Sequence, residues 1–171
     1  MTVEKTLAKI DDDLAAGRLP MARQRLRGLV SSFPADLTLR VRLAGVYRQF
    51  GEPAQAGRWG YLDAGRHPGE TAAFEAHYRT PADRMRALAW HGPESAAGTA
   101  FARAELAAVR AAASESLGRE VVWDRADPVL EEPPNPPSVT GDGLFIGGCV
   151  AVVLAVVALA CVGIGTLIAW W

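Results

Sequence analysis

Two stretches of the chain decide its fold: GRLPMARQRLRGLVSSFP at residues 17–34 and GEPAQAGRWGYLDAGRHP at residues 51–68. Each begins with glycine, has a proline near its start and ends on proline. Three residues recur 34 positions apart: Gly17 and Gly51, Ala22 and Ala56, and Pro34 and Pro68. Glycine commonly ends a helix, whereas proline is tolerated in a first turn. The two stretches therefore predict the second helices of two repeated helical hairpins.

The segment before each stretch carries one apolar stripe. Its members lie at offsets 0, 4, 7 and 11, which places them on one helical face. They are Val3, Leu7, Ile10 and Leu14 in the first segment, and Leu39, Leu43, Val46 and Phe50 in the second. These patterns predict helices over residues 2–16 and 36–50, capped at their starts by Thr2 and Asp36.

A period of 34 residues resembles that of tetratricopeptide helix–turn–helix units. The second unit matches their pattern of Leu, small residue, Tyr, Ala and Pro with Leu43, Ala44, Tyr47, Ala56 and Pro68. The first unit matches less well and has Lys9, Ile10 and Asp13 at three of these places. The resemblance implies an all-α domain that begins with two tetratricopeptide-like hairpins, residues 1–68. Two ordinary helical hairpins are the alternative.

Two such units bury little surface alone, so residues 69–118 are predicted to be capping helices of the same domain. Helices are expected over residues 70–78 and 80–90, and from Pro93 or Glu94 to Leu117. Thr80 and Asp83 resemble a helix start, and Gly118 is the expected C-cap. Trp59, Tyr61 and Trp90 are expected in the core, and the acidic run at residues 11–13 on a solvated face.

The end of the chain differs in composition from the domain. Residues 119–142 carry five prolines and four acids after Arg125, which predicts an extended acidic linker. Its first part, residues 120–123, is expected to pack back on the domain. Residues 143–171 read GLFIGGCVAVVLAVVALACVGIGTLIAWW and contain no charged side chain. About 20 apolar residues span a bilayer, so this segment predicts one transmembrane helix, with Trp170 and Trp171 at the membrane interface. A buried core helix is the alternative.

Composition limits the remaining classes. Cys149 and Cys161 both lie in the apolar segment, which excludes a disulfide scaffold or structural zinc in the domain. The start, MTVEKTLAKIDDD, lacks the apolar region of a secretory signal. We therefore expect a single-pass protein of the cell membrane with its N-terminal domain in the cytoplasm.

No catalytic, metal or cofactor site is predicted. His67, His77 and His91 lie in different segments, and no glycine loop suits a phosphate. The most distinctive polar feature is a set of arginines accompanied by one acid, Asp36: Arg18, Arg23, Arg25, Arg27, Arg40, Arg42 and Arg48. Such a patch suits phosphate oxygens of lipid or nucleic acid. A solvated surface is the alternative, and the absence of interleaved aromatics disfavours nucleic acid.

Two stretches resemble an actinobacterial family of small helical proteins of unknown function. They are RLRGLVSSFPADLTLRVRLAGVYRQFGEPAQAGRW at residues 25–59 and RMRALAWHGPESAAGTAFARAELAAVR at residues 84–110. The resemblance implies a bacterial setting and carries over no functional residue. The leading hypothesis is a non-enzymatic, membrane-tethered adaptor that binds a protein or peptide. The alternative is anionic-ligand binding by the patch from Arg18 to Arg48.

Overall fold

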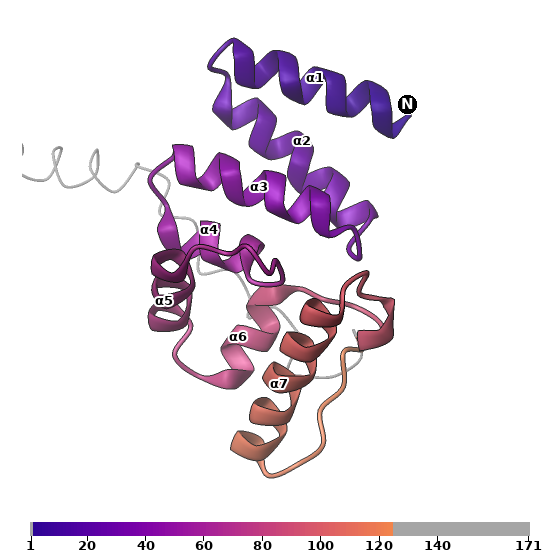
Figure 1. The fold of residues 1–171 in the computed structure, drawn as a ribbon, viewed down its shortest axis with the longest axis vertical. Helices are drawn as coiled ribbons and strands as arrows, with labels where there is room; N and C mark the ends of the chain where they lie inside the picture. Colours follow the sequence, from indigo (N-terminus) through magenta and orange to yellow (C-terminus); the bar gives the residue numbers. More distant parts are fainter. Residues whose placement is uncertain (1, 125–171) are drawn as a thin grey trace, which may run out of the picture. The chain divides into compact units, whose positions relative to one another are not determined.

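The computed structural model describes residues 2–124, which form seven α-helices and one short 3₁₀ turn and contain no strand. In chain order these are α1 (Val3–Ala15), α2 (Leu19–Ser32), α3 (Leu37–Gln49), α4 (Pro53–Gly60), α5 (Pro68–His77), α6 (Pro81–Leu88), η1 (Glu94–Ala96) and α7 (Ala100–Leu117) (Figure 1). No helix among them is both long and apolar enough to cross a membrane. The predicted linker beyond Asp124 and the predicted transmembrane helix, with Trp170 and Trp171, lie outside the described residues.

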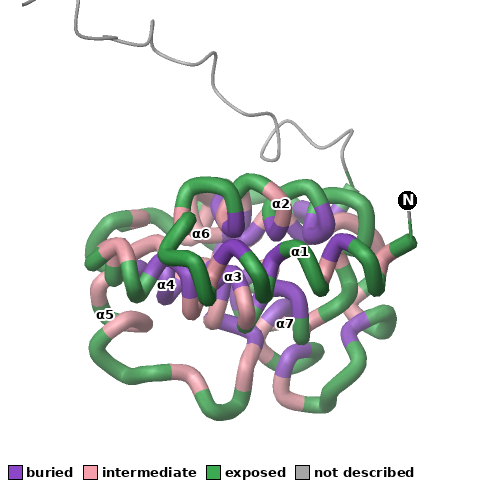
Figure 2. The backbone as a smooth tube through the Cα atoms, turned by 90° about the horizontal axis from the view of Figure 1, so that it is seen from above, coloured by how far each residue is buried: buried purple, intermediate pink, exposed green. Residues whose placement is uncertain are grey.

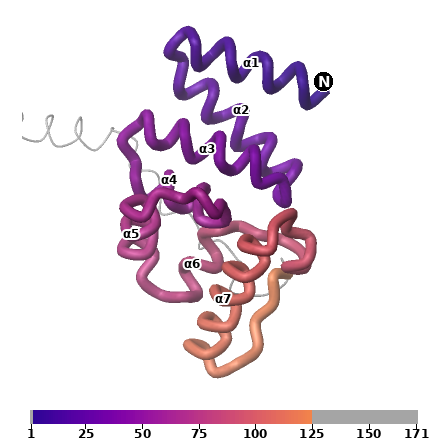
Figure 3. Tube along the Cα trace, viewed as in Figure 1, coloured from indigo at the N-terminus to yellow at the C-terminus, as the bar shows by residue number. Residues whose placement is uncertain are grey.

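The first four helices lie over the segments for which two helical hairpins were predicted. Each helix packs on the next, so α1 to α4 follow one another as a stack (Figure 3). Gly17 and Gly51 end the first helix of each hairpin with nearly equal φ angles, +69° and +71°. Such angles favour glycine because it has no Cβ. Ala22 and Ala56 are both fully buried, so the repeat places the same small residue at the same depth.

Helix starts follow the predicted capping residues in two cases. The Asp36 carboxylate accepts hydrogen bonds from the backbone N–H groups of Thr38 and Leu39, at 2.9 and 3.3 Å. The Thr80 hydroxyl accepts one from the backbone of Asp83 at 3.0 Å. Thr2 occupies the N-cap position of α1 without a capping bond from its side chain.

The start of α7 corrects the prediction. The helix begins at Ala100 instead of Pro93 or Glu94, because the Thr99 side chain caps it by accepting from the Ala102 N–H at 3.1 Å. Residues 94–96 form only the 3₁₀ turn. The other end agrees, since Gly118 closes α7 with a φ of +64°.

The domain contains two clusters of buried apolar side chains. Buried and exposed positions alternate along the helices that enclose them (Figure 2). The first cluster belongs to α1–α4 and is mainly aliphatic, with Leu26 and Leu43 fully buried and Tyr47 and Trp59 as its aromatic members. The predicted stripe of α1 lies here, with Ile10 fully buried and its other members partly buried.

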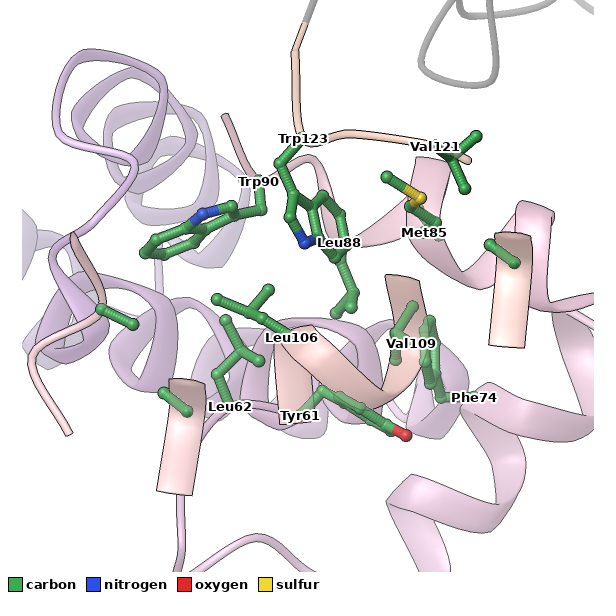
Figure 4. Close-up of a cluster of buried hydrophobic side chains, with 14 residues drawn as sticks. Tyr61, Leu62, Phe74, Met85, Leu88, Trp90, Leu106, Val109, Val121 and Trp123 are labelled. Carbon is green, nitrogen blue, oxygen red and sulfur yellow. The ribbon is translucent and has the colours of Figure 1, made fainter. Parts of the chain in front are cut away.

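The second cluster is richer in aromatic side chains and gathers Tyr61, Phe74, Trp90 and Trp123 around α6 and α7 (Figure 4). Val121 and Trp123 are both buried in it, which confirms that residues 120–123 pack back on the domain. Residues up to Trp123 therefore belong to the packed domain. Trp59, Tyr61 and Trp90 are all core residues, as predicted.

Helices α4 and α5 cross closely at Gly57. A Cβ at this position would lie 2.6 Å from the carbonyl carbon of Glu70 and 2.9 Å from the Cβ of Phe74. Any side chain here would push the helices apart. Glycine therefore permits the contact that joins the first four helices to the rest of the domain.

The acidic run at residues 11–13 was predicted to be solvated, and for Asp13 this is wrong. Asp13 is 3% exposed and forms ion pairs with Arg18, at 2.9 Å, and with Arg25. Three consecutive acids suggest one solvated surface. Consecutive residues of a helix nevertheless point in different directions, so Asp13 can face the interior while Asp11 and Asp12 face solvent. The buried carboxylate is stabilised by two arginines from the start of the second helix and the turn before it.

Candidate functional site

The structure distributes the seven predicted patch arginines over several environments. Five of them form ion pairs with acids that all lie outside the arginine-rich span: Arg18 and Arg25 with Asp13, Arg23 with Glu52, Arg42 with Asp11, and Arg48 with Glu70. Arg23 also stacks on the Phe50 ring, 4.6 Å from its centroid. Much of the local positive charge is thus offset by acids that folding brings near.

Arg40 differs from the others because it is 1% exposed. Its Nε donates to the carbonyl of Pro34 at 3.1 Å, and its Nη2 to those of Leu88 and Ala89 at 2.8 and 3.2 Å. Arg40 therefore belongs to the interior and binds the C-terminal carbonyl groups of α6, where a cation is favoured by the helix dipole. It cannot contribute to an exposed patch.

Arg27 is the remaining member. It is exposed on α2 and forms no ion pair with a described residue. It lies at the edge of a small pocket of about 290 Å³, which we call the arginine pocket. The pocket is lined by Arg27, Val30, Ser31, Pro34, Arg58, Trp59, Ala89 and His91.

Three parts of the chain build this pocket. Helix α2 and the turn after it supply Arg27, Ser31 and Pro34, whereas α4 supplies Arg58 and Trp59. The segment after α6 supplies Ala89 and His91. Ala89 has a φ of +46°, an angle that a residue with a side chain rarely adopts, and it ends α6 in this left-handed conformation.

Arg58 and Arg40 act on the same helix end. Arg58 Nε donates to the carbonyl of Ala87, next to the carbonyls that Arg40 holds. The Arg58 guanidinium lies 4.6 Å from the centroid of the Trp59 ring, and that of Arg40 lies 5.4 Å from it. The indole therefore contacts two cations, an arrangement that its electron-rich face stabilises.

The electrostatics of this cluster are unusual. Burial, and to a smaller extent the positive charge of Arg58, lower the pKa of Arg40 to about 10. Burial likewise lowers the pKa of Arg58, against a smaller opposing effect of Tyr78 and Tyr47, and Arg27 contributes to the lowering. Among the described residues, none that lines the pocket is aspartate or glutamate. Positive charge is thus concentrated here without a carboxylate in the wall.

Two donors in this cluster lack an acceptor. Trp59 Nε1 and Arg40 Nη1 are buried and have no hydrogen-bond partner in the described part of the chain. Buried polar groups in native structures are nearly always hydrogen-bonded, so each unsatisfied group requires an explanation.

A larger hollow of about 840 Å³ lies beside residues 91–94 and 120–124. Two of its charged groups are already engaged, because the Glu94 carboxylate accepts from Arg110 at 2.6 Å and also from Trp123 Nε1 at 3.2 Å. No set of three or more histidine, cysteine and acidic side chains suited to a metal ion occurs within residues 2–124.

The predicted arginine patch includes Arg27 but not the other polar residues that line this pocket, Arg58, Ser31 and His91. The predicted patch ended at Arg48, and Arg58 lies ten positions further on, next to a tryptophan that reads as core. One feature of the sequence could have indicated Arg58. It directly precedes Trp59, and adjacent residues of a helix point in different directions, so the two side chains cannot both lie at the centre of the apolar face.

These features define an all-helical domain within residues 2–124 that concentrates arginines where α2, α4 and the end of α6 meet. The chain belongs to a family of unknown function (DUF6584), which matches residues 1–169. This confirms the resemblance to a family without assigned activity. No curated protein and no solved structure matches the chain.

Proposed function

We propose that this chain is a non-enzymatic, single-pass membrane protein whose helical domain binds a protein or peptide partner beside the cytoplasmic face of the cell membrane. The observation that carries the proposal is the uncharged segment at residues 143–171, which follows a domain that encloses its own apolar cores.

The completeness of the two cores supports the membrane tether. Both clusters form from side chains within residues 2–124, including the fully buried Leu43 and Trp90. The exposed large apolar side chains of the domain are few: Met21, Phe33, Val41, Leu117 and Val122. They cannot cover an apolar segment of that length, so the segment requires another apolar environment, and a lipid bilayer supplies one.

The repeated hairpins support the binding role. Stacked helical hairpins present surfaces rather than a reactive centre, and tetratricopeptide-like repeats are a common form of this architecture. A tether raises the effective concentration of the domain near a partner that is already at the membrane. The five prolines after Arg125 are consistent with this role, because proline-rich sequences favour extended, semi-rigid spacers.

The tether is tested in the full chain with two lysines placed mid-segment, Leu154→Lys and Val157→Lys. Each lysine at a helix centre costs about 2.5 to 3.5 kcal/mol on insertion. We expect the unaltered chain to remain in the membrane fraction after alkaline carbonate washing and the double variant to be released. Release of both chains would refute the tether.

The partner is tested by affinity capture of the full chain from detergent-solubilised membranes, at low and high salt. The control is an unrelated soluble domain fused to residues 126–171. A protein retained at high salt by the full chain and absent from the control supports the adaptor. Recovery of nucleic acid alone, released as salt rises, would instead favour the arginine surface.

The alternative function, anion binding by the whole patch from Arg18 to Arg48, has weaker support. Carboxylates pair with Arg18, Arg25, Arg42 and Arg48, and Arg40 is buried. One part of that region nevertheless retains uncompensated positive charge, and it is a pocket rather than a surface.

A further inference from the structure

We propose that the arginine pocket is a binding site for a phosphoryl group, held by Arg27 and Arg58 and by the indole N–H of Trp59. This inference is independent of the membrane tether and the protein partner proposed above. It rests on the charge, the unsatisfied donors and the size of the pocket.

The charge of the pocket favours an anion. Arg27 and Arg58 line it, and Arg40 lies behind it, since Arg40 bonds to the carbonyls of Pro34 and Ala89, which are both in the wall. The part of the wall formed by residues 2–124 contains no acid. Like charges within a few ångströms destabilise one another, and an anion placed among them removes that cost.

The donors of the pocket point to a ligand rich in acceptor oxygens. The structural role of Arg40 and Arg58 at the end of α6 uses Nε and Nη2 of Arg40 and Nε of Arg58. Arg40 Nη1 and Trp59 Nε1 remain without acceptors although both are buried. The bonds that Arg40 and Arg58 form to the end of α6 leave these two N–H groups without acceptors. A bound oxyanion would supply an acceptor for the indole N–H.

A phosphoryl group suits the site better than a carboxylate. The pocket is lined by Arg27, Arg58 and Ser31, and by Trp59, whose buried indole N–H has no acceptor among the described residues. Four donors from two helices match the several oxygens of a phosphate, whereas a carboxylate presents two. Arginine also suits phosphate because its N–H groups form a planar fork.

The size of the pocket limits what the phosphate can be attached to. About 290 Å³ lies at the lower end of the range for small-molecule sites, about 300 to 1,000 Å³. The apolar part of the wall, Val30 and Pro34, accommodates a short carbon chain. A small phosphate ester fits, either free in solution or as the headgroup of a lipid.

The test observes Trp59 directly in the full chain, in micelles of a non-ionic detergent that contains no phosphate. The indole N–H resonance of Trp59 is assigned in a ¹H–¹⁵N spectrum by its loss in Trp59→Phe. Three probes are titrated: inorganic phosphate, acetate at equal ionic strength, and dioctanoyl phosphatidic acid added to the micelles.

We expect phosphate to shift the Trp59 resonance saturably and acetate to bind at least tenfold more weakly. Arg27→Gln should weaken phosphate binding about tenfold without unfolding the chain, because Arg27 is exposed and forms no ion pair with a described residue. Arg79→Gln, which removes another exposed arginine outside the pocket, should leave the affinity unchanged.

Saturable binding of phosphate in solution identifies a free phosphate ester as the source. Binding of phosphatidic acid at lower concentration than phosphate identifies a lipid headgroup. Either result supports the site only if the Arg27→Gln substitution weakens the binding of that probe. An unshifted Trp59 resonance with both phosphate probes, equal binding of acetate, or equal effects of Arg27→Gln and Arg79→Gln would overturn the proposal. None of these outcomes affects the membrane tether.

Discussion

The two halves of the domain are held together in different ways. In α1–α4 the helices follow a repeat, and neighbours along the chain are neighbours in space. In the second half, residues distant in sequence meet: Gly92 N–H donates to the carbonyl of Trp123, and Trp123 Nε1 donates to the Glu94 carboxylate. The structure of the first half therefore depends on a sequence repeat and on contacts between consecutive helices. The structure of the second half depends on a few specific long-range contacts.

The largest effect is expected from removing the central aromatic side chain of the second half. Trp90 is fully buried, and Trp90→Ala should lower the free energy of unfolding by about 3 to 5 kcal/mol. Leu43→Ala in the first core, also fully buried, should cost about 2 to 5 kcal/mol. Both values are measurable by urea unfolding of the full chain in detergent.

If the halves form one cooperative unit, each variant retains a single transition at lower urea. A separate early transition in Trp90→Ala, with α1–α4 still folded by hydrogen exchange, would show that the halves are independent.

The next effect concerns the junction at Gly57. Gly57→Ala should destabilise the domain by about 1 to 3 kcal/mol, because the new methyl group meets the backbone of Glu70 and the side chain of Phe74. Gly28→Ala is the matched control: it lies within α2 with no atom near the added Cβ, and it should stabilise by up to about 1 kcal/mol. Thermal unfolding of the two variants should shift in opposite directions, and equal shifts would contradict the close crossing.

A third prediction concerns the buried arginine that joins the halves. Arg40→Met should destabilise by about 2 kcal/mol, because the carbonyls of Leu88 and Ala89 lose their donor, while removal of a buried charge offsets part of this cost. Arg42→Met on the same helix removes only an exposed ion pair and should cost less than about 1 kcal/mol. The urea midpoints of the two variants measure the difference in stability. Equal decreases in the two midpoints would show that Arg40 does not join the two halves.

The smallest effect is a pH dependence at the start of α6. The hydrogen bond from Thr80, and the hydrogen bond and charge of Arg86, hold the pKa of Asp83 below its ordinary value of 3.8. Because the folded pKa is depressed, its stabilising contribution is present above about pH 4 and is lost as the pH falls through the folded value. Acid unfolding of Asp83→Asn compared with the unaltered chain should show the difference above that range and none below it.

The first half was largely predictable because its information is local. Pro20 and Pro53 begin helices, Gly17 and Gly51 end them, and Asp36 caps α3, so each boundary is encoded near where it occurs. The repeat itself is visible in the sequence as a spacing of 34 positions.

What the sequence did not reveal depends on contacts between distant segments. Arg40 follows Leu39 in an apolar stripe and reads as solvated, yet α6 supplies carbonyls that bury it. In the sequence Asp13 is part of an acidic run, whereas in the structure it forms ion pairs with Arg18 and Arg25. The pocket combines α2, α4 and the segment after α6, and no spacing along the chain indicates that these meet.

Burial of Arg40 also has a consequence for synthesis. The guanidinium lies 48 positions before the carbonyl of Leu88 that satisfies it. At about 5 to 20 residues per second, the ribosome needs about 2 to 10 s to add those positions. During that interval the first two hairpins carry a solvated arginine where the finished protein has a buried one. The amino-terminal stack therefore reaches its final structure only after α6 has emerged.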